Sequence, residues 1–179
     1  MAVVNDRLKQ NKGKSHVDFR TPPEVFRYCQ SRFGHYDLDV AASSENTLCP
    51  LFYSSEFRQN DALNEDNRWE GRVWCNPPYN NIKPWVAKAL REMEGGSMES
   101  ITLLVPASTC TKWFKSLWES IWCSDIVFIS GRLSFVGPHI HPDTKKATAT
   151  NPSVLIHLEA DFTKPQVIEL VEREVIMCY

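Results

Sequence analysis

The chain has 179 residues, of which 42% are hydrophobic and 23% are charged. This length indicates one domain with a real core, and this composition excludes both a disordered chain and a coiled coil. The formal net charge is -2, so no overall positive field attracts nucleic acid, and any contact with DNA has to come from a local basic face.

Cysteine spacing and hydropathy narrow the class of protein further. The six cysteines stand at irregular intervals without a Cys-x-x-Cys pair, a pattern that predicts neither a zinc site nor a disulfide framework. We therefore expect no metal. No apolar run is long enough to cross a membrane, and no secretory signal opens the chain. These features together predict a protein of a reducing cytoplasm.

Residues 1–19 are expected to form a flexible basic arm. They carry Arg7, Lys9, Lys12 and Lys14 and show no hydrophobic periodicity. A solvated terminus is the favoured interpretation, and a basic arm that contacts DNA phosphates is the alternative. Residues 20–179 are assigned to a single domain.

The string Thr21-Pro22-Pro23-Glu24 predicts the start of a helix. Thr21 is the expected capping residue, the two prolines suit the first turn, and Glu24 stands three residues after Thr21, as in a capping box. An apolar stripe follows, and Gly34 is expected to end the helix.

Two short strands are expected next. Residues 36–42 alternate like a strand and run into a polar turn at 43–46. Asp39 stands near the carboxyl end of this strand, where an open α/β sheet usually binds its ligand; a turn or capping acid is the alternative. Residues 51–53 predict the second strand, and Asp61 follows it within the string Asn60-Asp61-Ala62-Leu63.

Asn76-Pro77-Pro78-Tyr79 is the most informative stretch, and it follows the apolar run 72–75, a predicted buried strand. Two consecutive prolines fix φ and remove two amide donors, so the loop carbonyls can serve a ligand. The Asn76 side-chain oxygen and the Pro77 carbonyl could together accept both hydrogens of an exocyclic aryl amine, which turns the nitrogen lone pair toward an electrophile. The Tyr79 ring could stack on the base. An ordinary proline-rich turn is the alternative.

The rest of the chain continues the alternation of helices and strands. Trp113 belongs to an aromatic stripe that we interpret as core. The expected elements are a helix over 82–93, a buried strand over 101–105, a helix over 113–122, strands over 125–129 and 154–158, and a helix from Pro165 onward. This alternation predicts an α/β fold, a three-layer sandwich around a mostly parallel sheet.

From Phe19 to about Leu158, the chain resembles the small phage and prophage DNA adenine-N6 methyltransferases, the phage Dam family. The resemblance implies the Rossmann-like fold of enzymes that use S-adenosyl-L-methionine (SAM). It also implies catalytic roles for the loop residues, namely Asn76, Pro77, Pro78 and Tyr79.

The same resemblance implies where SAM binds. Thr21 and Pro22 would lie near its methionine end, and Asp61 with Ala62 near its adenine, although Asp61 could instead cap a turn. The amino acid part of SAM would lie near Asp39, Ala41, Ala42 and Ser43. These residues replace the glycine-rich turn that is typical of many SAM enzymes.

Residues 131–135 contain a Gly-Arg-aliphatic-x-Phe string that also occurs in the resembled family. Arg132 is a candidate for pairing with a DNA phosphate or for bracing the catalytic loop, and Phe135 is a candidate wall of the target-base pocket. A salt bridge and a core phenylalanine are the equally open alternatives.

The polar stretch 137–151 is the candidate for reading the DNA around the target, because no separate recognition domain fits in the chain. Lys145 and Lys146 are its candidate phosphate contacts. His139 and His141 lie in the same stretch, but no cysteine or acidic partner stands at a metal-binding spacing.

The resemblance implies methyl transfer from SAM to the N6 amine of an adenine flipped out of double-stranded DNA, by a monomer or a homodimer. Within the same class of enzyme, RNA adenine, cytosine N4 and protein glutamine are alternative acceptors. A catalytically inactive DNA-binding or decoy protein that kept the fold is the alternative outside that class.

Overall fold

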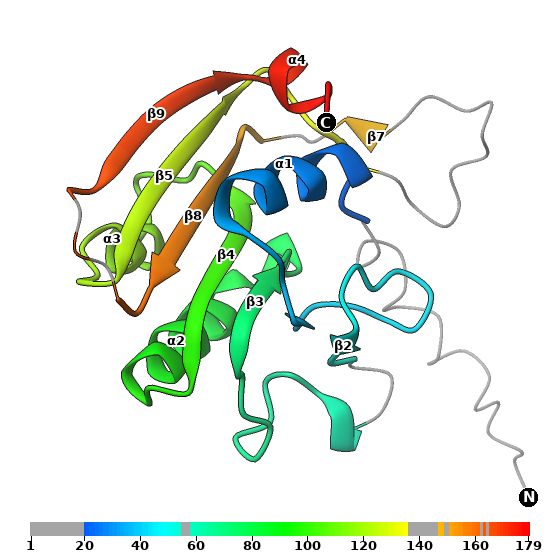
Figure 1. Ribbon diagram of the computed structural model, residues 1–179, viewed down its shortest axis with the longest axis vertical. Helices are drawn as coiled ribbons and strands as arrows, with labels where there is room; N and C mark the ends of the chain where they lie inside the picture. The colour runs from blue at the N-terminus through cyan, green and yellow to red at the C-terminus, as the bar shows by residue number, and fades with distance from the viewer. Residues whose placement is uncertain (1–19, 55–57, 136–146, 149–150, 162, 164) are drawn as a thin grey trace, which may run out of the picture.

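The computed structural model describes residues 20–54, 58–135, 147–148, 151–161, 163 and 165–179. Within these residues, seven strands form one sheet in the order β2-β1-β3-β4-β8-β5-β9, and β6 pairs with β7 separately (Figure 1). The strands are β1 (Leu38–Asp39), β2 (Leu51–Phe52), β3 (Gly71–Cys75), β4 (Met98–Pro106), β5 (Cys123–Ser130), β6 (Ser134–Phe135), β7 (Ala147–Thr148), β8 (Ser153–Glu159) and β9 (Val167–Glu172).

Helices cover both faces of the sheet, which confirms the predicted three-layer α/β sandwich. Val25 and Phe26 of α1 pack in the core on one face, and Trp85 of α2 and Leu117 of α3 pack in the core on the other (Figure 1). The α-helices are α1 (Pro23–Phe33), α2 (Ile82–Glu94), α3 (Lys112–Trp118) and α4 (Arg173–Ile176), and two 3-10 turns span Arg58–Asn60 and Tyr79–Asn81.

Strand direction decides where a ligand can bind. β1 runs parallel to β2 and β3, β3 to β4, and β5 to β9, whereas β8 is antiparallel to both β4 and β5. The prediction of a mostly parallel sheet is therefore confirmed. Since β1, β3 and β4 share one direction, their carboxyl ends lie at one edge of the sheet, which is the usual ligand edge of such folds.

The start of α1 differs from the prediction that Thr21 caps it. Pro22 occupies the N-cap position, and no side chain caps the helix. Because Pro22 presents only its carbonyl, which accepts from the amide of Val25, the Thr21 hydroxyl is available for a contact elsewhere. The end of the helix is as predicted, since Gly34 follows it with φ of 90°.

Two other boundaries were also predicted wrongly. The strand expected over 36–42 is shorter, because β1 comprises only Leu38–Asp39, although the flanking amides of Asp37 and Val40 also donate to carbonyls of β3. The helix expected over 113–122 ends at Trp118, and Ile121 is 80% exposed. Although Ile121 stands at helical spacing, it does not extend α3, because only four residues separate Trp118 from the start of β5 at Cys123.

The tail forms a strand rather than the predicted helix. β9 pairs in parallel with β5 along its length, at the edge of the sheet. Its apolar residues fit a helical period and a strand equally well, but their β-branched side chains favour a strand once an edge is available. Glu169 on β9 pairs with Arg32 of α1, so the strand also contributes to the α1 face. Only four residues, Arg173–Ile176, are helical.

A buried chain of hydrogen bonds runs from Tyr36, between α1 and β1, to the middle of the sheet. His157 Nδ1 is 2.8 Å from Thr102 Oγ1, which is 2.7 Å from the Tyr36 hydroxyl. The His157 ring stacks on Phe33 with centroids 4.2 Å apart. Burial lowers the pKa of His157 to about 4, and the weaker attraction of Asp125 opposes this shift.

Acid is expected to destabilise the fold through His157. The unfolded chain binds a proton near the ordinary pKa of 6.5 and the folded chain only near 4, so the free energy of unfolding falls as the pH drops through this range. Between pH 7.5 and pH 5 the expected loss is roughly 2 kcal/mol.

Urea unfolding of the wild type and of His157→Asn at both pH values isolates this effect. Asp39, whose pKa burial raises to about 6, acts in the opposite direction, but it is present in both proteins and cancels in the difference. A stability difference that does not change with pH would contradict the prediction.

Candidate active site

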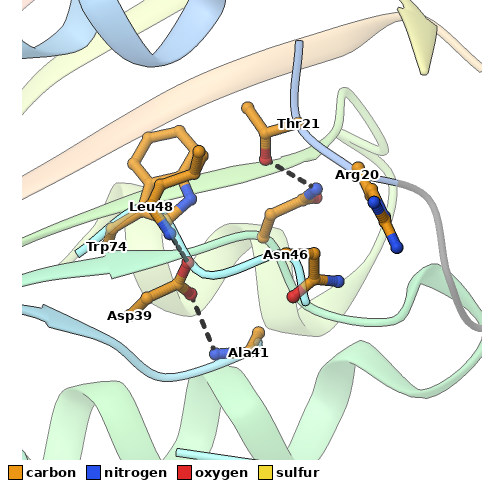
Figure 2. A pocket seen from close by; sticks show the side chains of 8 residues that line it. Arg20, Thr21, Asp39, Ala41, Asn46, Leu48 and Trp74 are labelled. Atoms are coloured by element: carbon orange, nitrogen blue, oxygen red, sulfur yellow. Dashed lines mark hydrogen bonds between the residues drawn. The ribbon is translucent and has the colours of Figure 1, made fainter. Parts of the chain in front are cut away.

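Two neighbouring parallel strands end side by side and bring several of the predicted residues together. Asp39 ends β1 and pairs in register with Trp74 of β3, so Asn76 begins the loop immediately beyond. The segment before α1 crosses the same edge. The resulting pocket is lined by Arg20, Thr21, Asp39, Ala41, Asn46, Leu48, Trp74 and Asn76 (Figure 2).

The pocket is small and polar. Its cavity volume is about 20 Å³, so it accommodates one small charged or polar group rather than a whole nucleoside. Arg20 supplies its positive charge. The Arg20 Nε atom is buried and has no hydrogen-bond partner among the described residues, and a terminal nitrogen of Arg20 lies 3.5 Å from the carboxylate of Glu45.

Asp39 supplies the negative charge of the pocket. It is 4% exposed, and its two carboxylate oxygens accept hydrogen bonds from the amides of Ala41, at 3.2 Å, and Leu48, at 3.3 Å (Figure 2). Burial raises the pKa of Asp39 to about 6, and the two amides oppose this shift. The side chain therefore shapes the turn after β1 while it also faces the pocket.

A direct hydrogen bond joins two of the predicted site residues. The Nδ2 group of Asn76 donates to Oγ1 of Thr21 at 3.0 Å (Figure 2). Thr21 is 8% exposed. The hydroxyl that was predicted to cap a helix is thus committed to the loop that carries Asn76.

The Tyr79 side chain contacts Phe135 through its ring and Ser153 through its hydroxyl. Its ring makes an edge-to-face contact with Phe135, with centroids 5.9 Å apart. Its hydroxyl is buried and has no hydrogen-bond partner within accepted geometry, and Ser153 is the side chain that interacts with it. Burial raises the pKa of Tyr79 well above its usual range, so the phenol stays neutral.

A second and larger cavity adjoins Tyr79. Its volume is about 330 Å³, which is within the range of small-molecule sites, roughly 300–1,000 Å³. It combines two aromatic rings, amide side chains and one cation. The lining residues are Tyr79, Asn80, Asn81, Ile82, Lys83, Pro106, Ser108, Trp113 and Asn151.

Asp61 and Ala62 do not line either pocket. Asp61 Oδ1 accepts from the amide of Leu63 at 3.0 Å, which is the turn-capping role left open from the sequence. Ala62 is buried, and its carbonyl accepts from the indole of Trp69. The segment 61–64 is attached to α2, because the buried Lys88 of that helix donates a hydrogen bond to the carbonyl of Asn64 at 2.8 Å.

The other predicted cofactor residues lie beside the first pocket without lining it. The amide of Ala42 donates to the carbonyl of Tyr53, and the amide of Ser43 donates to Asn46 Oδ1 at 2.6 Å. Pro22 is buried at the start of α1. Of the three predicted residues Ala41, Ala42 and Ser43, only Ala41 thus lines the pocket.

The residues predicted to contact DNA differ in their surroundings. Phe135 is 3% exposed and packs on Tyr79. The Arg132 side chain is exposed, and its backbone carbonyl accepts from Arg173; no brace from its guanidinium to the catalytic loop is seen among the described residues. Lys145 and Lys146, together with His139, His141 and the arm 1–19, lie outside the described residues.

Several pocket residues were not predicted from the sequence. Arg20 was given no role, and its position next to Thr21 was the available signal. Asn46 stands in the polar turn 43–46, which had been noted only as a turn. Trp113 was interpreted as core, yet it is half-buried and lines the second cavity. Nothing local distinguishes a half-buried tryptophan from a core one.

The part of the chain that the structure describes contains neither a cluster of metal ligands nor a membrane-spanning helix. No three histidine, cysteine or acidic side chains gather there as metal ligands do. No helix in the same part is both long enough and apolar enough to span a membrane.

The chain has clear relatives among characterised families. The model of the family described as DNA N-6-adenine-methyltransferase (Dam) matches residues 9–177. A DNA N-6-adenine-methyltransferase of Haemophilus phage HP1 is 30% identical over 158 residues, which are 86% of this chain and 87% of that protein.

A second relative is longer than this chain. A DNA N-6-adenine-methyltransferase of Escherichia phage T1 is 39% identical over 117 residues, which are 64% of this chain and 45% of that protein. The matched region thus spans less than half of the phage T1 protein. The rest of the phage T1 protein lies outside the region that matches this chain.

Proposed function

This chain belongs to the DNA N-6-adenine-methyltransferase (Dam) family, and from this premise we propose that it transfers a methyl group from SAM to the N6 amine of adenine in DNA. The observation that carries the proposal is the position of the Asn76–Tyr79 loop. It leaves β3 between a small charged pocket and a cavity of about 330 Å³. Two ligands could therefore meet at this loop.

The small pocket fits the amino acid end of SAM. The buried Nε of Arg20 lacks a partner among the described residues, and a carboxylate would satisfy it through a charge-assisted hydrogen bond. Asp39 at the same pocket offers the matching charge for an ammonium group. When bound, SAM supplies an electrophilic methyl group, and Asp61 with Ala62 would lie toward its adenine.

The loop fits the target amine. An aryl amine is a poor nucleophile because its lone pair is delocalised into the ring. Accepting both amine hydrogens, at Asn76 Oδ1 and at the Pro77 carbonyl, directs the lone pair toward the methyl group. Because a neutral amine needs no strong base to react, the side chains act by alignment and by electrostatic stabilisation.

The larger cavity fits the rest of the flipped nucleotide. Tyr79 offers a ring for stacking, and Trp113 lines the same cavity. Lys83 would meet a phosphate, which provides the local basic contact that a chain of net charge -2 requires. An adenine in a duplex has to leave the stack to reach this cavity.

Incubation with labelled SAM and unmethylated bacterial DNA, followed by nucleoside analysis, tests the proposal. N6-methyladenine is the expected product. If the label is found in N4-methylcytosine, in RNA or in protein instead, that group and not adenine in DNA is the acceptor. Failure to transfer any label, with SAM still bound, would point to another amine. Failure to bind SAM as well would favour an inactive DNA-binding protein.

Acid is expected to weaken cofactor binding through Asp39. Its pKa is about 6, so a falling pH protonates the carboxylate and removes its attraction for the ammonium group. The dissociation constant of S-adenosylhomocysteine, which has the same amino acid end as SAM, should rise by up to about tenfold per pH unit below 6.

Calorimetry on the wild type and on Asp39→Asn checks this expectation. The variant should bind more weakly at neutral pH and should lose the pH dependence, because its side chain does not ionise. A thermal unfolding curve for each protein controls for the two amides that Asp39 holds. An unchanged pH dependence in the variant would show that another group is responsible.

A further inference from the structure

Thr21 and Asn76 meet although 55 residues separate them in the sequence. Thr21 comes from the segment before α1, and Asn76 from the loop after β3. Their hydrogen bond measures 3.0 Å and runs from Asn76 Nδ2 to the Thr21 hydroxyl oxygen. One side chain predicted to bind the cofactor is thus bonded to a side chain predicted to contact the target amine.

The Thr21 side chain is well suited to hold another group in place. It is 8% exposed, so it is packed on nearly all sides. Its backbone is restricted because Pro22 follows, and its β-branched side chain has few rotamers. Because Pro22 rather than Thr21 is the N-cap of α1, the hydroxyl is not used by the helix.

Asn76, in contrast, has a soft terminal torsion. The side-chain amide of asparagine rotates broadly about its last bond, and a half turn exchanges its oxygen with its NH₂ group. The proposed reaction needs Oδ1 of Asn76 to face the target amine. If the Asn76 NH₂ group faced it instead, two hydrogen-bond donors would meet and no hydrogen bond would form. With Nδ2 donating to Thr21, Oδ1 is directed to the opposite side of the amide.

We propose that Thr21 is a positioning residue, whose hydroxyl holds the Asn76 amide with its oxygen directed toward the target amine. This inference rests on the proposed methyl transfer and gives Thr21 a role other than contact with the cofactor. Thr21 acts through Asn76 and touches no reacting atom. The segment that lines the cofactor pocket thereby also orders the loop that receives the base.

Thr21→Val and Thr21→Ser form a matched pair for the test. Valine has nearly the same shape but cannot accept the hydrogen bond, whereas serine keeps the hydroxyl. Thr21→Val should lower kcat by about 10- to 100-fold, as expected for loss of one positioned hydrogen bond. The dissociation constant for S-adenosylhomocysteine should stay within about threefold, and Thr21→Ser should restore kcat to within about fivefold.

A second measurement does not depend on activity. In protein labelled with ¹⁵N-asparagine, the Asn76 side-chain amide signal is identified by its loss in Asn76→Asp. This signal should show slowed exchange with water in the wild type and in Thr21→Ser, and fast exchange in Thr21→Val. Equal thermal unfolding of the three proteins ensures that the comparison is made on folded protein.

The outcomes separate this inference from the proposed function. An Asn76 signal that Thr21→Val leaves unchanged overturns the inference whether or not the enzyme is active. Weaker binding of S-adenosylhomocysteine with unchanged kcat also overturns it and makes Thr21 a cofactor ligand. A wild-type protein that transfers no methyl group refutes the proposed function instead, while the signal still reports on the hydrogen bond.

Discussion

Asn76→Ala is expected to leave only a small residual rate of methyl transfer while binding of SAM persists. The change removes the side-chain acceptor for the target amine but leaves Arg20 and Asp39 in the cofactor pocket. Loss of one preorganised hydrogen-bonding group at a reacting centre costs about 3 to 4 kcal/mol, which corresponds to roughly a 100- to 1,000-fold loss in kcat. Single-turnover transfer of labelled methyl measures this loss, and calorimetry measures the binding of SAM.

Asn76→Asp is the matched control for this experiment. Its carboxylate still accepts a hydrogen bond from the amine, and the Thr21 hydroxyl can turn its proton toward the new carboxylate. Measurable transfer should therefore remain in this variant. Near-normal turnover of Asn76→Ala would show that the mechanism proposed for the loop is wrong, and loss of SAM binding would show that Asn76 supports the pocket instead.

Tyr79→Ala is expected to cause the second large loss of activity, because it removes the ring on which we propose that the target base stacks. Stacking of one base on an aromatic side chain is worth about 1 to 3 kcal/mol. The variant also leaves Phe135 without its edge-to-face partner. We therefore expect kcat/KM for DNA to fall by roughly 10- to 100-fold, with little change in the binding of SAM.

Tyr79→Phe separates the ring from the hydroxyl. The hydroxyl is buried without a hydrogen bond of accepted geometry, so its removal should leave kcat/KM nearly unchanged. DNA with 2-aminopurine at the target position adds a direct readout, because its fluorescence rises when the base leaves the stack. Equal fluorescence and kinetics in the Ala and Phe variants would rule out stacking on Tyr79.

The local elements of the fold were largely predictable. The apolar run before Asn76 forms β3 as expected, and the helix after the loop runs over Ile82–Glu94. Here hydrophobic periodicity, prolines and glycines act over a few neighbouring residues. The tail was not predictable in this way, because Val167–Glu172 has a pattern that fits either a helix or a strand. The free edge of β5 decided between them.

The composition of the candidate site was only partly predictable. Asp39 was predicted because it stands near the carboxyl end of a strand, and Asn76 because its oxygen and the Pro77 carbonyl could accept the hydrogens of an amine. Arg20 was assigned no role and Trp113 was interpreted as core, since neither has a local pattern that marks a pocket. Asp61 was assigned to the cofactor, and the structure shows its carboxylate on the amide of Leu63.

The sequence by itself determined most of the elements and the restricted loop Asn76–Tyr79, because two prolines after a buried strand restrict the backbone whatever surrounds them. Only the tertiary structure decided which groups face one another. The hydrogen bond between Thr21 and Asn76 and the pocket that Arg20 shares with Asp39 join segments far apart in the chain. Such contacts depend on how the helices and strands pack, and local preferences carry no information about the partner of a side chain across the sheet edge.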